Sequence, residues 1–343
     1  MRLSIIAIAT LVALAAIPAA AQDIRGALPY RMYRDGTAKS LEKSNSPRDW
    51  ALASQLLETD AAIPLLSHER AALLLKAAQA APNDHLVQWM WANAALSASD
   101  CGAPAVCGAR AGAIARLEPD NAAAWLPVVD RAWKAKDATA VDGALAHMAA
   151  AKRYDAHYGM AAAAWIDVYK RFPPPSLAAL KNLEPSGQPV TQSSLVSIEA
   201  ADTVNAPDSA LIESCRKSTN ANAPAPHFAT CGHVARLMLG QASTLYGRII
   251  GFNVLRGSGE EKPADVPGIR ETAWLAEQFE KALSGSDETA ERETLADTIA
   301  TGSEVTAVQN LLRHTGTALA PPPKWQWIRN GQPVDMLHAP ATH

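Results

Sequence analysis

Four side chains that could bind a metal or form a disulfide lie close together in the sequence: Cys215, His227, Cys231 and His233. Thiolate and imidazole groups are common zinc ligands, so these residues could form one zinc site. The alternative is a disulfide between Cys215 and Cys231. No Cys-x-x-Cys pair accompanies them, and the cysteines of an exported chain are normally oxidised. We favour the disulfide and expect no bound metal.

The other two of the four cysteines, Cys101 and Cys107, enclose a short loop that contains Pro104. An even number of cysteines in local pairs is typical of disulfides, so we predict a second bridge between Cys101 and Cys107. Each bridge would stabilise the fold by about 2–4 kcal/mol, mainly by restricting the unfolded chain. The haem-attachment sequence Cys-x-x-Cys-His does not occur, and we expect no cofactor.

Residues arranged for catalysis are not evident. The chain contains no G-x-S-x-G, H-E-x-x-H, Walker or G-x-G-x-x-G sequence, each of which carries a known chemistry. His147 and His157 flank an expected helix connection and could meet as a metal pair, although a lone His at a helix end is more often solvated or capping. The pairs Glu260-Glu261 and Asp287-Glu288 fall in a loop or at a helix start, where acidic groups favour the helix dipole. An acid/base pair assembled from distant segments would leave no local pattern.

The N-terminus has the three parts of a secretory signal peptide. Arg2 supplies a positive charge, Leu3–Ile17 is uncharged and apolar, and the small residues before Gln22 offer a cleavage site between Ala21 and Gln22. The apolar run is shorter than the ~20 residues of a membrane-spanning helix, although an uncleaved anchor is the alternative. No Cys lies near the cut. The pattern predicts a periplasmic or secreted protein of bacterial type that is not a lipoprotein.

The charge distribution argues against two classes of partner. The formal net charge is −3, and the Lys and Arg residues are scattered. Nucleic-acid binding requires a basic surface, so we expect none. No later segment is long and apolar enough to predict a membrane span in the mature chain.

The hydrophobic pattern predicts an all-α fold. Ser46 and Pro47 form a helix start, with Ser as N-cap and Pro at the first helical position. Apolar residues then recur at helical spacing, and alternation typical of strands is essentially absent. The run Phe172-Pro173-Pro174-Pro175 ends this region, because proline cannot continue a helix. We therefore expect six parts: signal peptide 1–21, irregular segment 22–45, helical-repeat region 46–172, linker 173–191, second helical region 192–320 and tail 321–343.

Two features of the second region predict tertiary packing. Gly247 and Gly251 lie four residues apart on an expected helix, which favours close packing against another helix. Trp325 and Trp327 in the tail favour docking on the body of the protein, because exposed Trp is unusual.

Helix-breaking residues recur at a regular spacing in the first region. Pro82-Asn83-Asp84 is followed 37 residues later by Pro119-Asp120-Asn121, and Tyr154-Asp155 follows Pro119-Asp120 by 35. A period in the mid-thirties is typical of stacked helix pairs. The segment Leu117–Trp125, together with Leu145 and Met148 at packing positions, resembles the tetratricopeptide family over about residues 67–172.

The sequence departs from the pattern of this family at three places. Val129 stands where the family has Gly, Tyr154 where it has Pro, and the Cys101–Cys107 loop interrupts the preceding unit. The resemblance implies a short solenoid of helix pairs whose curved surface, in that family, usually binds proteins or peptides.

Tryptophans are the candidate residues of a binding groove. Most should fill the core between Ala-rich helices. Trp89 and Trp91 lie two apart and cannot share one helix face, so one of them is available to line a groove with Trp125 or Trp133.

Two functions are consistent with these patterns. The first is a non-enzymatic scaffold in the bacterial envelope that binds a protein or peptide. The second is a helical hydrolase or lyase that acts on an envelope component such as peptidoglycan, with an acid/base pair built across the two regions. A polar cleft holding Glu or His would favour the enzyme, and an open groove lined by Ala and Trp would favour the scaffold.

Overall fold

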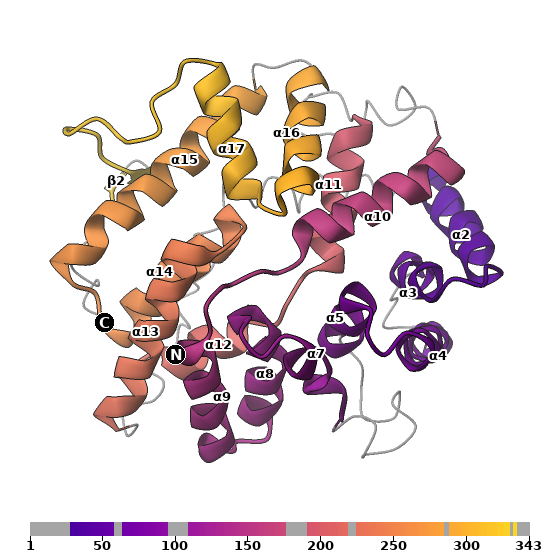
Figure 1. Ribbon diagram of the computed structural model, residues 1–343, viewed down its shortest axis with the longest axis horizontal. Coiled ribbons are helices and arrows are strands. Elements are labelled where there is room, and N and C mark those ends of the chain that lie inside the picture. The colour runs from indigo at the N-terminus through magenta and orange to yellow at the C-terminus, as the bar shows by residue number, and fades with distance from the viewer. Residues whose placement is uncertain are drawn as a thin grey trace, which may run out of the picture.

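The computed structural model (Figure 1) describes residues 28–57, 64–94, 109–175, 191–218, 224–284, 288–329 and 332–334. The regular structure in these segments is almost entirely helical, as the sequence predicts. A two-residue antiparallel pair, β1 (Ile328–Arg329) with β2 (Gln332–Pro333), lies near the C-terminus.

The helices of the first half, labelled as in Figure 1, are α2 (Leu28–Glu42), α3 (Pro47–Leu56), α4 (Pro64–Ala80), α5 (His85–Asn93), α7 (Ala113–Leu117), the 3₁₀ turn η2 (Ala122–Trp125), α8 (Leu126–Lys134), α9 (Ala138–Ala150) and α10 (Tyr158–Arg171). Those of the second half are α11 (Gln192–Thr203), α12 (Asp208–Cys215), α13 (Ala225–Gln241), α14 (Leu245–Ser258), η5 (Pro263–Asp265), α15 (Val266–Ser284), α16 (Glu288–Thr301) and α17 (Glu304–His314).

The two halves of the chain pack against each other (Figure 1). Helix α12 contacts α8, α13 contacts α9, and α16 contacts both α10 and α11. One hydrophobic core extends from Tyr30 to Leu295 and includes residues on both sides of the prolines at 173–175. A smaller cluster joins Leu245 and Leu275 to the apolar face of α17. The faces of α8 and α9 that meet α12 and α13 are therefore covered by the chain itself.

The regularly spaced residues of the first half lie at helix starts: Asp84 and Asn121 are N-caps, and Asp155 lies two residues before the N-cap of α10. The side chain of Asp84 accepts a hydrogen bond from the Val87 backbone N–H, at 3.1 Å. Asn121 accepts one from Ala123 at 3.2 Å, and Asp155 accepts one from the His157 N–H at 2.9 Å. Each side chain satisfies a backbone donor that the helix leaves without an intrahelical partner, which gives the spacing a local physical cause.

The N-terminal segment corrects one prediction. Residues 22–45 were expected to be irregular, but Leu28–Glu42 forms helix α2. Its buried side chains include Tyr30, Arg34 and Leu41, which lie on one face at helical spacing. Arg34 forms an ion pair with the buried Glu199 of α11. Because buried polar side chains such as Arg34 interrupt the apolar residues of this face, the sequence shows no clear hydrophobic period. The burial of the face becomes evident only from its packing against α11.

The packing expected of Gly251 is confirmed. A Cβ atom there would lie 2.7 Å from the Met238 Cβ and 2.9 Å from the Ala235 carbonyl oxygen. Both contacts belong to α13, so the glycine permits the close approach of α13 and α14.

The expected docking of the tail is also confirmed. Trp325 and Trp327 are partly buried and pack against the core. The Trp325 indole N–H donates to Glu277 at 3.2 Å, and Arg270 donates to the Trp325 carbonyl at 2.7 Å. The tail is thus attached to α15 by polar as well as aromatic contacts.

Candidate functional site

Three interhelical connections meet at the centre of the molecule. The Ser243 N–H donates to the Tyr154 carbonyl at 3.1 Å, and the Val305 N–H donates to the Ser243 carbonyl at 3.1 Å. The Ser243 hydroxyl donates to Asp155 at 3.0 Å. Residues 154–157, 242–245 and 302–305 are therefore joined by direct hydrogen bonds, although they come from both halves of the chain.

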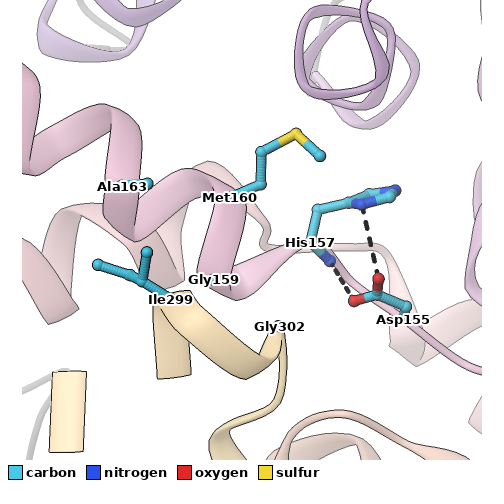
Figure 2. Close-up of a pocket in the computed structure, with 7 residues that line it drawn as sticks. All are labelled: Asp155, His157, Gly159, Met160, Ala163, Ile299 and Gly302. Atoms are coloured by element: carbon cyan, nitrogen blue, oxygen red, sulfur yellow. Dashed lines mark hydrogen bonds and ion pairs between the residues drawn. The ribbon is translucent and has the colours of Figure 1, made fainter. Parts of the chain in front are cut away.

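A cavity of about 240 Å³ lies beside this junction, between the start of α10 and the end of α16 (Figure 2). Its lining residues are Asp155, His157, Gly159, Met160, Ala163, Ile299 and Gly302. Gly159 permits α10 and α16 to approach each other closely beside the cavity, because a Cβ atom there would lie 2.8 Å from the Thr298 carbonyl oxygen. Figure 2 shows the His157 ring turned toward Asp155 and away from Ile299 and Ala163.

Glu118, which contacts the cavity-lining His157, is the centre of a charged network. Its side chain is 2 % exposed, and its Oε2 accepts from Arg153 at 2.6 Å and from Asn121 at 2.8 Å. Its Oε1 lies 3.0 Å from His157 Nε2 and also contacts His85 Nδ1. The His157 contact has an ion-pair distance without hydrogen-bond alignment. Glu118 therefore joins the starts of α5, η2 and α10.

The environment of Glu118 favours its ionised form. Burial alone would raise its pKa, but the interactions with His157, His85 and Asn121 outweigh burial and hold the pKa well below its usual range. His157 has a left-handed backbone, with φ 64°, which is uncommon for a residue with a side chain. The ion pair and the hydrogen bond to Asp155 hold it in this conformation.

The network leaves His157 poorly suited to proton transfer. Its Nε2 faces Glu118 at 3.0 Å and its Nδ1 lies 3.8 Å from Asp155 Oδ2. A general base needs a ring nitrogen within reach of the substrate, but both nitrogens lie within ion-pair distance of carboxylates. None of the residues found to line the cavity carries a hydroxyl, thiol or amine. The arrangement is that of a structural ion-pair network.

Two further buried carboxyl groups lie near the junction. Burial raises the pKa of Asp208 to about 7, against the hydrogen bonds from Tyr246 and Tyr154. Burial also raises the pKa of Glu304, whose carboxylate accepts from the Leu245 N–H at 2.8 Å. Both groups lie between helices of the second half and the Tyr154–Tyr158 segment.

The predicted bridge between Cys215 and Cys231 is present, with an S–S distance of 2.08 Å. His227 lies beside it, whereas His233 is exposed. Among the described residues, no group of three or more His, Cys, Asp or Glu side chains is arranged to hold a metal ion. The predicted Cys101–Cys107 bridge lies outside the residues that the structure describes.

The structure corrects the prediction that Trp89 or Trp91 lines a groove, because the two residues are 0 % and 5 % exposed. Helix α5 contacts α3, α4 and α7, so both of its tryptophan-bearing faces are covered. Trp125 and Trp133 are half-buried on η2 and α8 and retain exposed surface.

His147 and His157 do not meet. His147 is exposed, and its ring stacks on Trp125 with a centroid distance of 4.0 Å and an interplanar angle of 5°. His157 belongs to the Glu118 network. Sequence reasoning missed Glu118 and Asp155, although both lie in the regularly spaced segments at 117–125 and 154–155 that it singled out.

No protein-family model, curated protein or solved structure matches this chain. Within the described segments, no helix has the length and apolar character needed to cross a membrane.

Proposed function

We propose that this protein is an exported helical scaffold of the bacterial envelope that binds a protein or peptide. The observation that carries the proposal is the stacked pair of Trp125 and His147, which is half-exposed on the η2–α9 surface. Large, rigid aromatic groups with exposed surface are typical centres of binding interfaces.

The surroundings of this pair suit the approach of another chain. Gly143, Ala146 and Ala150 are exposed on α9 beside His147, and their small side chains leave the stacked rings accessible. Trp133 adds a second half-buried indole on α8. The η2, α8 and α9 segments contact one another, so the aromatic groups are presented by a packed unit.

Export is supported by two independent features. The N-terminal 21 residues have the composition of a signal peptide. The Cys215–Cys231 bridge fits an oxidising compartment, because such bridges are rare in the reducing cytosol.

The test is an affinity capture of residues 22–343 from envelope extract after mild crosslinking, read by mass spectrometry. We expect one stoichiometric protein partner, lost in Trp125→Ala and retained in Trp50→Ala, which changes a half-buried tryptophan on α3. Circular dichroism establishes that each variant is folded. A partner captured equally by wild type and Trp125→Ala, or the absence of any partner, contradicts the proposal.

A second candidate is an enzyme that acts on an envelope polymer such as peptidoglycan. It is favoured by the convergence of Asp155 and His157 on a cavity between the two halves of the chain. The engagement of both His157 nitrogens by carboxylates counts against it. Incubation of the protein with purified peptidoglycan tests it: soluble products formed by wild type and absent with Asp155→Asn would establish the enzyme.

A further inference from the structure

The Cys215–Cys231 bridge has a histidine and a carboxylate aligned beside it. His227 lies one helical turn before Cys231 on α13, and its Nε2 lies 3.8 Å from the Cys231 Sγ. Its Nδ1 lies 2.6 Å from Oδ1 of Asp142, on α9. The order carboxylate, imidazole, sulfur is the arrangement that activates cysteine thiolates.

The hydrogen bonds of His227 indicate a charged ring. Besides Asp142, the ring contacts the Ser214 carbonyl oxygen, 2.8 Å from Nε2. A carboxylate and a carbonyl can only accept hydrogen bonds. Both contacts are satisfied only when each ring nitrogen carries a proton, so the geometry places a cation next to the sulfur of Cys231.

Charged groups of both signs lie around the bridge, and Asp142 pairs directly with the ring. Lys217 lies with its Nζ 5.3 Å from the ring centroid of Phe228, and Phe228 packs on His227 at 5.2 Å. Glu213 on α12 is paired with Arg216 at 2.9 Å. Asp142 is 51 % exposed at its side chain, so its charge is partly screened by water, whereas both cysteines are 0 % exposed.

We propose that Cys215–Cys231 is a redox-active bridge whose reduced form is stabilised by the His227 cation acting on the Cys231 thiolate, with Asp142 as a positioning residue. A disulfide that only stabilises the fold (an inert staple) does not require a positive charge beside one of its sulfur atoms. A stabilised thiolate makes the disulfide a stronger oxidant, because it lowers the free energy of the reduced form.

The reaction partner is a dithiol. Because both cysteines are 0 % exposed, the reaction requires a local opening that exposes the bridge. One thiolate of the dithiol then attacks the Cys215 sulfur, the S–S bond breaks, and its electron pair remains on Cys231 as a thiolate facing His227. The second thiol of the dithiol then attacks the sulfur of the mixed disulfide that belongs to the dithiol. This releases Cys215, which takes up a proton. The dithiol becomes a disulfide, the protein gains two electrons, and one proton is released to solvent.

The test measures the redox equilibrium of the full mature chain in buffers of reduced and oxidised dithiothreitol. Because both sulfurs are buried, each sample is followed until the ratio of reduced to oxidised protein no longer changes. Alkylation and peptide mass spectrometry report Cys215 and Cys231 separately from Cys101 and Cys107. We expect His227→Ala to shift the equilibrium toward the disulfide by tenfold or more, which corresponds to about 30 mV.

A matched control lies on the same helix. His233 is two residues after Cys231 but exposed, so His233→Ala should leave the equilibrium within threefold of wild type. In the reduced wild type, absorbance at about 240 nm should report a thiolate with a pKa below the usual ~8.5. His227→Ala should raise that pKa by about one unit or more, a shift that loss of packing alone would not produce.

Asp142→Asn keeps the proposal testable if His227→Ala does not fold, because Asp142 lies at the surface. We expect a shift of the same sign but smaller, about threefold or more, since the neutral amide no longer favours the charged ring. If folded His227→Ala and Asp142→Asn both match wild type in equilibrium and in thiol pKa, the bridge is an inert staple and the proposal is wrong.

Discussion

At the scale of single residues, Glu118 stabilises more of the structure than its place in a short turn suggests. One carboxylate contacts side chains from the starts of α5, η2 and α10, and an arginine between α9 and α10. Breaking a buried ion pair by removing one partner is costly, because the remaining charges lose their compensation.

We therefore predict that Glu118→Gln lowers the free energy of unfolding by about 2–4 kcal/mol at pH 7. The folded-state pKa of Glu118 lies well below the 4.5 that is usual for a glutamate. The stabilisation is therefore complete above about pH 4.5 and is lost as the pH falls through the folded-state pKa. Urea unfolding at several pH values should show wild type and variant converging in acid.

A surface ion pair provides the control for Glu118. Lys134 and Asp130 pair at 2.8 Å, but the lysine side chain is 73 % exposed. Lys134→Ala should therefore cost no more than ~1 kcal/mol. A loss in Glu118→Gln no larger than the loss in this control would contradict the role assigned to the network.

For Asp208 we predict a pH dependence of stability opposite to that of Glu118. Its folded-state pKa is raised from 3.8 to about 7, so the folded protein prefers the protonated acid. The cost of the buried charge is absent below about pH 4, grows between pH 4 and 7, and is complete above pH 7.

Asp208→Asn should therefore stabilise the protein at pH 8 by about 2–4 kcal/mol and have little effect at pH 4. Thermal unfolding across this range measures the difference. Asp120→Asn, which changes a side chain that is 54 % exposed, should not share this pH dependence. Equal stability of wild type and Asp208→Asn at both pH values would show that the buried charge carries no cost.

At the scale of elements, the contact between α10 and α16 depends on the absence of one side chain. Gly159 allows the backbone of α16 to approach, and a Cβ atom there would meet the Thr298 carbonyl at 2.8 Å and the Gly302 Cα at 3.3 Å. Backbone atoms cannot move aside as a flexible side chain can, so the two helices would have to separate.

Gly159→Ala should thus cost about 1–3 kcal/mol. Gly143 on α9 is the matched control, because a Cβ atom there meets nothing within 4 Å. Gly143→Ala should be neutral or stabilising by up to ~1 kcal/mol, since alanine favours a helix interior. Chemical unfolding of both variants measures the contrast, and equal effects of the two changes would contradict this account of the contact.

At the scale of the whole molecule, the continuous core predicts cooperative unfolding. Core residues on both sides of the prolines at 173–175 belong to one cluster, and α12, α13 and α16 pack against helices of the first half. Separate units would each need a core of their own.

We expect calorimetry of the oxidised protein to show a single transition, with a calorimetric enthalpy close to the van't Hoff enthalpy. Tryptophan fluorescence and far-ultraviolet circular dichroism should give the same midpoint. Two resolved transitions would mean that the halves unfold independently despite their shared core.

The sequence by itself determined the features that depend on neighbouring residues. The all-α class and the helix start at Ser46-Pro47 follow from local backbone preferences, and the structure confirms them. The Cys215–Cys231 bridge was also predictable, because its cysteines are close in sequence. The predictions of export and of a protein partner stay predictions.

Only the tertiary structure decided which faces of these helices are covered. Trp89 and Trp91 were candidates for a groove because spacing within α5 does not reveal that neighbouring helices cover both of its faces. Helix α2 was missed because its buried Arg34 depends on Glu199, 165 residues away. The Glu118 network and the His227–Asp142 pair likewise join residues that are distant in sequence, and the free energy of such contacts exists only once the chain has brought them together.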